Sequence, residues 1–216
     1  MSLENITDLI QGSDEWRQAR VGSLGASRIA DAIARTKTGY GASRANLMAE
    51  LICERLTGQP APTFVSAAMQ HGTETEPEAR NAYSFYSGNT VEQVGLIRHP
   101  TIEQSHASPD GLIGEDGMVE IKCPQPAAHL DTLTAQEIPA KYITQMMWQM
   151  ACSGRQWVDY VSYSPSFPEN MRLFIKRLPR DDKRIAELES EIAAFLLEMA
   201  VKLSQLNSLY GEKEAA

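Results

Sequence analysis

The sequence SPDGLIGEDGMVEIK, residues 108–122, predicts a β-hairpin on which the rest of the fold depends. Two short runs that can form strands flank the segment 115–117, and a loop of three residues is a common hairpin connection. Such a loop often has its last residue in the left-handed conformation, which glycine adopts at low cost, and Gly117 occupies that position. The expected cross-strand pairs are Gly114 with Met118, Leu112 with Glu120, and Asp110 with Lys122.

The alternation of side chains along the two predicted strands gives this hairpin a polar face. Asp110, Glu120 and Lys122 share it, while Val119 and Ile121 point to the opposite face. Asp110 and Glu120 would be diagonal neighbours with backbones roughly 7–8 Å apart, close enough for one cation to bridge the two carboxylates. A two-residue Asp-Gly turn is the competing register, and it would move Asp110 to the other face.

Two acids and a lysine on one face are the groups that a magnesium-dependent phosphodiesterase needs. Carboxylate oxygens are hard ligands suited to Mg²⁺, and an ammonium group beside them can position a water molecule and bind a phosphate oxygen. The alternative is structural, because Pro-Asp-Gly is also an ordinary turn and Glu-x-Lys is common at an exposed strand edge. The short pattern matches many unrelated chains, so the interpretation needs support from elsewhere in the sequence.

The composition is typical of a globular protein. The chain has 216 residues, of which 43% are hydrophobic, enough to bury a sizeable core. We expect a single domain, residues 1–216, with a core at about 14–178 and a C-terminal helix at about 180–209. No apolar run approaches the roughly 20 residues of a membrane span, and the first residues lack the features of a signal peptide. Three unclustered cysteines indicate neither a disulfide framework nor a zinc site, so a cytoplasmic protein without a membrane partner is expected.

The net charge of −8 argues against a polyanionic partner, but the charges are unevenly distributed. Between Trp16 and Leu47, six basic residues stand against Asp31 alone, a local excess of five positive charges. The six are Arg17, Arg20, Arg28, Arg35, Lys37 and Arg44. A basic stripe on an acidic body can steer an anion to one face. The alternative is an arginine-rich, solvated helix face.

Hydrophobic spacing, capping residues and breakers predict a helical N-terminal half, a strand-rich middle and a long C-terminal helix. Ser13 and Ser27 are expected to cap the first two helices, and Gly72 to interrupt a later one. The expected helices are 14–21, 28–35, 43–57, 66–71, 76–87, 141–153 and 180–209. The expected strands are 90–98, 105–108, the two hairpin arms, 157–163 and 171–178. The apolar stripe of the last helix could cover its own sheet or a neighbouring subunit.

Two features outside the hairpin could add to its polar face. Lys141, Gln145 and Gln149 form a polar line at i, i+4 and i+8 on an otherwise apolar helix. This line is either a surface stripe or the side of a helix packed beside the active strands, with Gln145 reaching a phosphate or a water. Glu76, at an expected helix start before Pro77, is either a third carboxylate or a residue that favours the helix dipole.

Arg20 and Ser27 suggest an anion site. Ser27 is expected at a helix N-terminus, where free backbone donors and the hydroxyl can meet an anion, and Arg20 can bind it with two parallel hydrogen bonds.

A set of short motifs, taken in order along the chain, carries a resemblance to a known family. The motifs are WRQARVG at 16–22, AS at 26–27, HG at 71–72, Glu76, AR at 79–80, SPDG at 108–111, EIKCP at 120–124 and Gln145. In this order and spacing, from about Asp14 to Met150, the chain resembles the lambda-type phage exonucleases. These are also called YqaJ or alkaline exonucleases and belong to the PD-(D/E)xK nuclease superfamily. Each block alone is weak, whereas the ordered set is specific.

The resemblance implies a restriction-endonuclease-like fold of the α/β (α+β) class, with a mixed β-sheet flanked by helices. It also implies a 5′→3′ exonuclease that degrades one strand of linear double-stranded DNA and leaves a 3′ single-stranded overhang for recombination by strand annealing. Family members are toroidal homotrimers that act at double-stranded DNA ends, often beside a single-strand annealing protein. A phage or prophage origin in a bacterial cell is implied as well.

The resemblance assigns roles to the residues of the polar face. Asp110 and Glu120 match the metal-binding acids, with the backbone carbonyl of Ile121 as a further ligand. Glu76 matches an additional helix-borne acid that helps a second Mg²⁺. Lys122 matches the catalytic lysine, which positions or deprotonates the attacking water. Mn²⁺ is a possible substitute for Mg²⁺, and no ATP requirement is expected because no Walker-type Gly-Lys-Ser/Thr motif is present.

Other matched positions concern the DNA. Arg20, Ser27, Ser108 and Gln145 match residues around the pocket that receives the terminal 5′-phosphate. Lys37 matches a position that touches the duplex backbone. A structure- or sequence-directed endonuclease or junction resolvase of the same superfamily remains an alternative, because two acids and a lysine do not specify end recognition. An inactive DNA-binding recombination module is the alternative of a different class.

Overall fold

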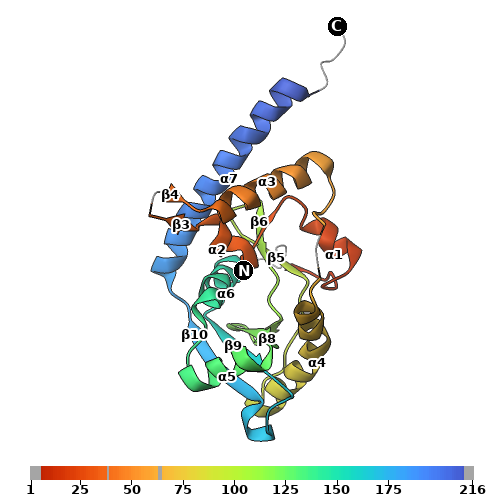
Figure 1. Cartoon of the computed structure of the whole chain (residues 1–216), viewed down its shortest axis with the longest axis vertical. Coiled ribbons are helices and arrows are strands. Elements are labelled where there is room, and N and C mark those ends of the chain that lie inside the picture. Colours follow the sequence, from red (N-terminus) through yellow and green to blue (C-terminus); the bar gives the residue numbers. More distant parts are fainter. Residues whose placement is uncertain (1–5, 38, 63–64, 212–216) are drawn as a thin grey trace.

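The computed structural model describes residues 6–37, 39–62 and 65–211, and it confirms a mixed α/β fold built around the predicted hairpin (Figure 1). The central sheet has the strand order β10-β9-β8-β7. Its strands are β7 (Gly111–Ile113), β8 (Gly117–Lys122), β9 (Trp157–Tyr163) and β10 (Leu173–Pro179), with a short 3₁₀ turn at Glu169–Met171 before the last. The sheet is mixed because β8 and β9 are parallel whereas the other two pairs are antiparallel.

A second, smaller sheet leads into the hairpin. Its order is β1-β5-β6-β2, and its strands are β1 (Ile6–Thr7), β5 (Leu96–Arg98), β6 (Ser105–Ala107) and β2 (Leu24–Gly25). The expected strand at 90–98 is therefore too long. Between residue 90 and β5 the described residues make one isolated bridge, from Glu92 to Leu112.

The hairpin forms in a different register from the expected one. Gly111 pairs with Val119 and Leu112 with Met118, a shift of two residues, and the left-handed residue of the loop is Gly114 rather than Gly117. The polar face survives because a shift of two residues leaves every side chain on its own side of the sheet. Gly117 is needed for a different reason: a Cβ there would lie 2.2 Å from the Trp157 ring.

The crossover between the parallel strands β8 and β9 contains two helices. Parallel neighbours cannot be joined by a tight turn, and the connection consists of α5 (Pro126–Ala135) and α6 (Ala140–Ser153). The second was expected from the sequence and the first was not. Only His129 and Thr132 of α5 are buried, so this helix has no apolar stripe for a periodicity argument to detect.

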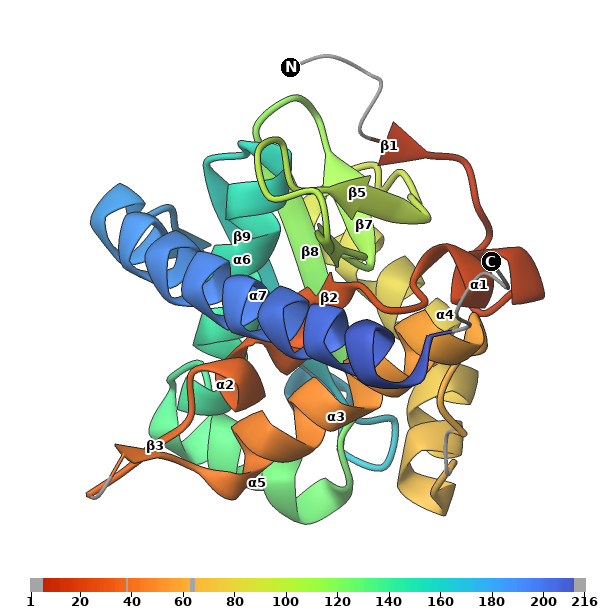
Figure 2. The ribbon, with the colours of Figure 1, turned by 90° about the horizontal axis from the view of Figure 1, so that it is seen from above.

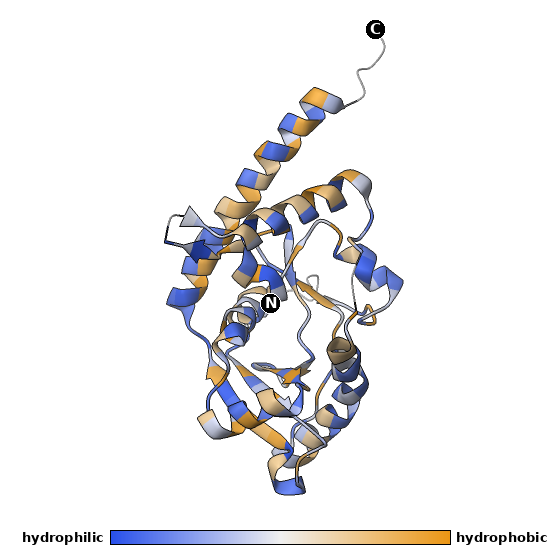
Figure 3. Ribbon diagram, in the orientation of Figure 1, coloured by the Kyte–Doolittle hydropathy of each residue, from blue (hydrophilic) through white to orange (hydrophobic). Residues whose placement is uncertain are grey.

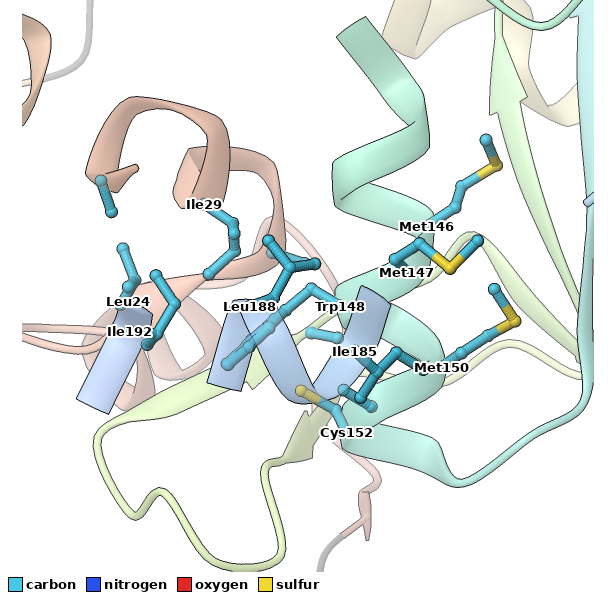
Figure 4. Packing of buried hydrophobic residues seen from close by; sticks show 14 of the residues in the cluster. Leu24, Ile29, Met146, Met147, Trp148, Met150, Cys152, Ile185, Leu188 and Ile192 are labelled. Carbon is cyan, nitrogen blue, oxygen red and sulfur yellow. The ribbon is translucent and has the colours of Figure 1, made fainter. Parts of the chain in front are cut away.

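The main core lies between α6 and the C-terminal helix α7 (Asp182–Tyr210), and α7 crosses in front of α6 in Figure 2. Figure 4 shows Trp148 and Met150 of α6 packed beside Ile185 and Leu188 of α7. The short helix α2 (Ile29–Ala32) and α3 (Ala42–Thr57) close the same cluster. The buried residues of α7 are Ile185, Leu188, Ile192, Phe195, Leu196 and Met199. The stripe of α7 therefore covers the core of its own chain.

The far half of α7 projects from the body, and hydrophilic and hydrophobic residues alternate along it (Figure 3). Among the described residues, α7 alone is long and apolar enough to cross a membrane by length and composition. The buried stripe accounts for part of this apolar character.

The opposite face of the central sheet is covered by α4 (Ala67–Ser87). This helix is continuous, so the expected interruption at Gly72 and restart near Glu76 are wrong. Pro77 removes one backbone donor, but Ala79 and Tyr83 are fully buried against the sheet, and that packing holds the helix together. Tyr83 also donates a 2.8 Å hydrogen bond to Asp159 of β9.

The N-terminal segment confirms one expected cap and corrects the other. Ser13 caps α1 (Asp14–Ala19) by accepting a hydrogen bond from the Trp16 amide. Ser27 instead lies inside a 3₁₀ turn, η2 (Ala26–Arg28), and makes no cap. The helix expected at 28–35 ends at residue 32, and a small hairpin of β3 (Arg35–Thr36) and β4 (Gly39–Tyr40) follows. Arg35 and Tyr40 both hydrogen-bond Glu191 of α7, which anchors this hairpin to that helix.

The basic residues of the N-terminal segment do not form a free positive stripe. Four of the arginines are in ion pairs within the chain: Arg17 with Asp14, Arg28 with Asp31 and Glu50, Arg35 with Glu191, and Arg44 with Glu198. Arg44 is also buried and lies 3.9 Å from the Tyr40 ring centroid. Most of the local positive charge is therefore paired with carboxylates of the same chain.

Replacing Gly117 by alanine is expected to destabilise the protein by about 1–3 kcal/mol, because the added methyl group meets the Trp157 ring in a packed sheet. The control is Gly72→Ala. Its new Cβ meets nothing within 4 Å, and it is expected to stabilise α4 by about 0.5–1 kcal/mol. Urea unfolding of both variants measures the two changes. Equal stability of the two variants would contradict the packing argument.

Candidate active site

Asp110 and Glu120 lie side by side at the edge where the hairpin joins the second sheet. Asp110 continues β7 one step beyond the Gly111–Val119 pair, which places it beside Glu120 rather than opposite Lys122. The Asp110 carboxylate accepts a 2.6 Å hydrogen bond from the backbone amide of Ile121. Backbone pairing thus fixes both acids at the same level of adjacent strands.

Glu120 is almost completely buried, and three donors hold its carboxylate. Gln145 donates to one oxygen and Gln149 to the other, each at 2.5 Å, and Lys122 forms an ion pair with the first. The polar line on α6 is therefore the side of a helix packed beside the active strands, as one of the two interpretations predicted. Gln145 contacts the acid in this arrangement, and Lys141 of the same line is exposed.

The carboxylates repel one another, and Lys122 offsets part of that repulsion. Desolvation raises the pKa of Asp110, and the neighbouring Glu120 and Glu76 raise it further, against the opposing effect of Lys122. Desolvation by itself would lower the pKa of Lys122, but Glu120 and Asp110 outweigh it and raise that pKa above its ordinary value. The site as it stands is a crowded anionic cluster with an ammonium group as its counter-charge.

Glu76 belongs to the same cluster although it lies in the middle of α4 rather than at a helix start. Desolvation raises its pKa, Arg80 and Lys122 oppose that shift, and Glu120 adds to it. Arg80 forms an ion pair with Glu76 one turn along the helix, and its buried Nε has no hydrogen-bond partner among the described residues. Glu76 therefore interacts electrostatically with Asp110, Glu120 and Lys122 of the hairpin.

The donor set suits a hard divalent cation. Asp110, Glu120, Glu76 and the backbone carbonyl of Ile121 offer only oxygen atoms, as Mg²⁺ prefers, and their mutual repulsion would be relieved by a cation. Within the described ranges, no three acidic, histidine or cysteine side chains already stand as a metal-binding group. The Glu120 oxygens are turned toward the two glutamines and Lys122, so binding would require its carboxylate to exchange partners.

Arg20 lies beside Trp16, and Trp16 links it to the hairpin. The Arg20 guanidinium stacks 3.9 Å from the centroid of the Trp16 ring, whose Nε1 donates to the Gly95 carbonyl at 2.8 Å and to the Ser108 hydroxyl at 3.3 Å. Ser108 is two residues before Asp110. Two residues of the expected phosphate pocket, Arg20 and Ser108, are therefore joined through one indole ring next to the acids.

The other two DNA-related residues are placed differently. Ser27 is exposed on η2, which packs against α6 and β6. Lys37 is exposed and lies between β3 and β4, and the β3–β4 hairpin lies at the edge of the molecule in Figures 1 and 2. The structure therefore brings Lys37 into no contact with the acidic cluster. A cavity of about 1030 Å³ lies between β3, α6 and α7 and contains none of the site residues.

Some residues of the site are missed by reading the sequence. The sequence places Gln149 in the polar line without indicating its role, and it places Arg80 in a motif only. His106 accepts a hydrogen bond from Arg20, and no sequence pattern predicts this contact. It depends on the pairing of β6, which carries His106, with β2, about 80 residues away in sequence.

Comparisons with known proteins agree on one family. The model of the YqaJ-like viral recombinase domain matches residues 15–156. The crystal structure of an alkaline exonuclease, LHK-Exo from Laribacter hongkongensis, is 49% identical, with 91% of this chain and 97% of that chain covered and a TM-score of 0.85. The same exonuclease in complex with dAMP gives 48% identity, the same coverage and a TM-score of 0.86.

A more distant structure shares the fold. A phage-related exonuclease from Haemophilus somnus 129PT is 15% identical over 85% of this chain and 96% of that chain, with a TM-score of 0.69. A search of curated proteins found no match.

Replacing Asp110 by asparagine is expected to raise the melting temperature of the metal-free protein at neutral pH. The raised pKa of Asp110 means that its ionised form costs stability, and asparagine removes the charge while it can still accept from the Ile121 amide. The gain should shrink as the pH falls through the raised pKa of Asp110 and should vanish below about 3, where aspartate is neutral in both the folded and the unfolded state. Thermal melts in EDTA across this pH range measure it.

The control for this measurement is Glu115→Gln, which removes an exposed charge from the hairpin loop. Excess Mg²⁺ should stabilise the wild type more than the Asp110→Asn variant, because the variant lacks one ligand. A lower melting temperature for Asp110→Asn in EDTA would show that the acids are not crowded.

Proposed function

This chain is a member of the YqaJ-like viral recombinase domain family, and on that basis we propose that it is a metal-dependent nuclease that degrades one strand of linear double-stranded DNA from its 5′ end. The observation that carries the proposal is the buried Glu120, held beside Asp110 and Lys122 on adjoining strands. The product would be a duplex with a 3′ single-stranded overhang, a substrate for recombination by strand annealing.

The acids would hold the metal. Asp110, Glu120 and the backbone carbonyl of Ile121 are the proposed ligands of Mg²⁺, with Glu76 helping a second ion and Mn²⁺ as a substitute. When bound, the metal supplies a Lewis acid that activates water and offsets charge on the phosphate oxygens. The two glutamines of α6 hold the Glu120 side chain in place, because both of its oxygens are hydrogen-bonded to that helix, and metal binding would exchange one of these contacts for the cation.

Lys122 is proposed to act as an ammonium group. It lies against Glu120 with its pKa raised, so in the metal-free protein it is protonated and donates hydrogen bonds rather than accepting a proton. From this position it can orient a water molecule and a phosphate oxygen and stabilise the negative charge that develops during hydrolysis.

The end of the substrate would be read by Arg20, Ser108, Ser27 and Gln145. Arg20 offers a planar, charged fork suited to a phosphate, and Trp16 ties it to Ser108, two residues from Asp110. Capture of a terminal 5′-phosphate by Arg20 and Ser108, so close to Asp110 in the fold, would place the neighbouring phosphodiester over the proposed metal ligands. That geometry would confine cutting to the end of a strand and give it a direction.

Further features follow from the family rather than from the contacts within one chain. We propose that the protein works as a ring-shaped homotrimer on double-stranded DNA ends and without ATP, beside a single-strand annealing protein. It would act in the cytoplasm of a bacterial cell that carries the phage or prophage. Lys37, exposed on the β3–β4 hairpin, is the proposed contact to the duplex backbone.

Digestion of linear duplexes labelled on one strand tests the proposal. In the presence of Mg²⁺, strands with a 5′-phosphate should be lost from that end, while closed circular DNA stays intact. Lys122→Ala should lower the rate by about a hundredfold or more, because the ammonium group that orients the water and stabilises the developing negative charge is removed.

The control variant is Lys183→Ala, which removes an exposed lysine at the start of α7 and should leave the rate unchanged. Cutting of closed circles at the rate of linear DNA would favour the endonuclease or junction-resolving alternative. Binding of DNA ends without any Mg²⁺- or Mn²⁺-dependent hydrolysis would favour an inactive recombination module.

A further inference from the structure

The partner of Arg20 is a buried histidine of the second sheet. His106 lies in β6 opposite Gly25 of β2 and is 1% exposed. Its Nε2 is 3.1 Å from Arg20 Nε. Arginine has only donors, so Arg20 Nε–H donates and His106 Nε2 accepts. This contact joins residues that are 86 positions apart and fixes one edge of the guanidinium group.

The contacts of the two ring nitrogens define the tautomer of His106. Because Nε2 is an acceptor, the proton of the neutral ring is on Nδ1, which donates to the Ser23 hydroxyl at 2.9 Å. Burial lowers the pKa of His106 to about 3, with smaller contributions from the charges of Arg20 and Arg98. The ring therefore stays neutral and keeps its acceptor.

Arg20 differs in this respect from the other arginines of the N-terminal segment. Arg17, Arg28, Arg35 and Arg44 are each paired with a carboxylate, which offsets their charge. Within the described ranges Arg20 has no ion pair: its direct contacts are a neutral imidazole and the face of the Trp16 indole, and the carboxylate of Glu54 acts on it through space without a hydrogen bond. Both partners orient the guanidinium and leave its positive charge for an anion.

The donors that remain on Arg20 are the ones an anion needs. Nε is engaged by His106, and among the described residues Nη1 and Nη2 have no hydrogen-bond partner. These two groups lie in the plane of the guanidinium, whose tilt is set by the stacking on Trp16. The backbone of β2 packs closely against the His106–Arg20 pair. A Cβ on Gly25 would lie 3.0 Å from His106 Nε2 and 3.6 Å from Arg20 Nη2.

We propose that His106 is a positioning residue that orients Arg20 toward the terminal phosphate and thereby sets the preference for 5′-phosphorylated DNA ends. The inference rests on the proposed exonuclease function and assigns part of its end specificity to a residue that does not touch the substrate. A carboxylate at the same place would hold Arg20 equally well but would neutralise it. A neutral acceptor holds the side chain and preserves the charge.

The test compares duplexes that carry a 5′-phosphate with duplexes that carry a 5′-hydroxyl, using the full chain and Mg²⁺. The measured quantity is the ratio of kcat/KM for the two ends. His106→Leu removes the acceptor and should lower this ratio roughly tenfold, mainly through KM for the phosphorylated end. His106→Gln offers one acceptor and one donor and should retain most of the preference.

Two further variants separate positioning from a general loss of structure. Gly25→Ala crowds His106 without removing it and should also lower the ratio. His99→Gln changes another buried histidine, which follows β5 in the same sheet and stacks on Trp148 rather than on the Arg20 pair. It should lower the melting temperature and leave the ratio unchanged. Anisotropy titrations of the same duplexes in EDTA give the preference in binding, independent of catalysis.

The outcomes distinguish this inference from the proposed function. An unchanged ratio and unchanged EDTA binding preference in folded His106→Leu protein would overturn the role of His106 while end-dependent digestion stood. A wild type that digests linear DNA without regard to the end group would overturn it together with the phosphate pocket. A wild type without nuclease activity would overturn the proposed function, and the anisotropy titrations would still decide for or against the positioning role.

Discussion

The burial of the Glu120 carboxylate is the constraint on which the site depends. An ionised carboxylate is costly to remove from water unless donors and an opposite charge replace the lost hydration. Gln145 and Gln149 supply amide donors from successive turns of α6, and Lys122 supplies the charge. This arrangement requires α6 to dock on β8, which the crossover to β9 and the packing of α7 on the outer side of α6 make possible.

The protein uses its charges in three different ways. The acids of the hairpin and Glu76 are crowded, so their repulsion can be relieved by a cation. Most arginines of the N-terminal segment are paired with acids and serve the fold. Arg20 is the exception, because a neutral His106 and the Trp16 ring hold it without offsetting its charge. An acidic protein can therefore keep a local positive group that is not paired with a carboxylate.

The errors in the sequence interpretation have identifiable physical causes. The hairpin register was wrong by two residues, yet the polar face was right, because side chains alternate with a period of two. The break at Gly72 was wrong because local helix propensity is weaker than the packing of Ala79 and Tyr83 on the sheet. The helix α5 was missed because it buries almost no apolar residues.

The sequence by itself determined several elements and the family: the hairpin with two acids and a lysine on one face, the strand at 157–163 and the long amphipathic helix. These depend on periodicity, breakers and motif spacing, which are local properties. Only the tertiary structure decided which groups surround Glu120, that Glu76 lies inside a continuous helix near it, and that His106 accepts from Arg20. Such contacts join residues tens of positions apart, and a buried polar group takes its partners from whichever strands and helices the packed core brings beside it.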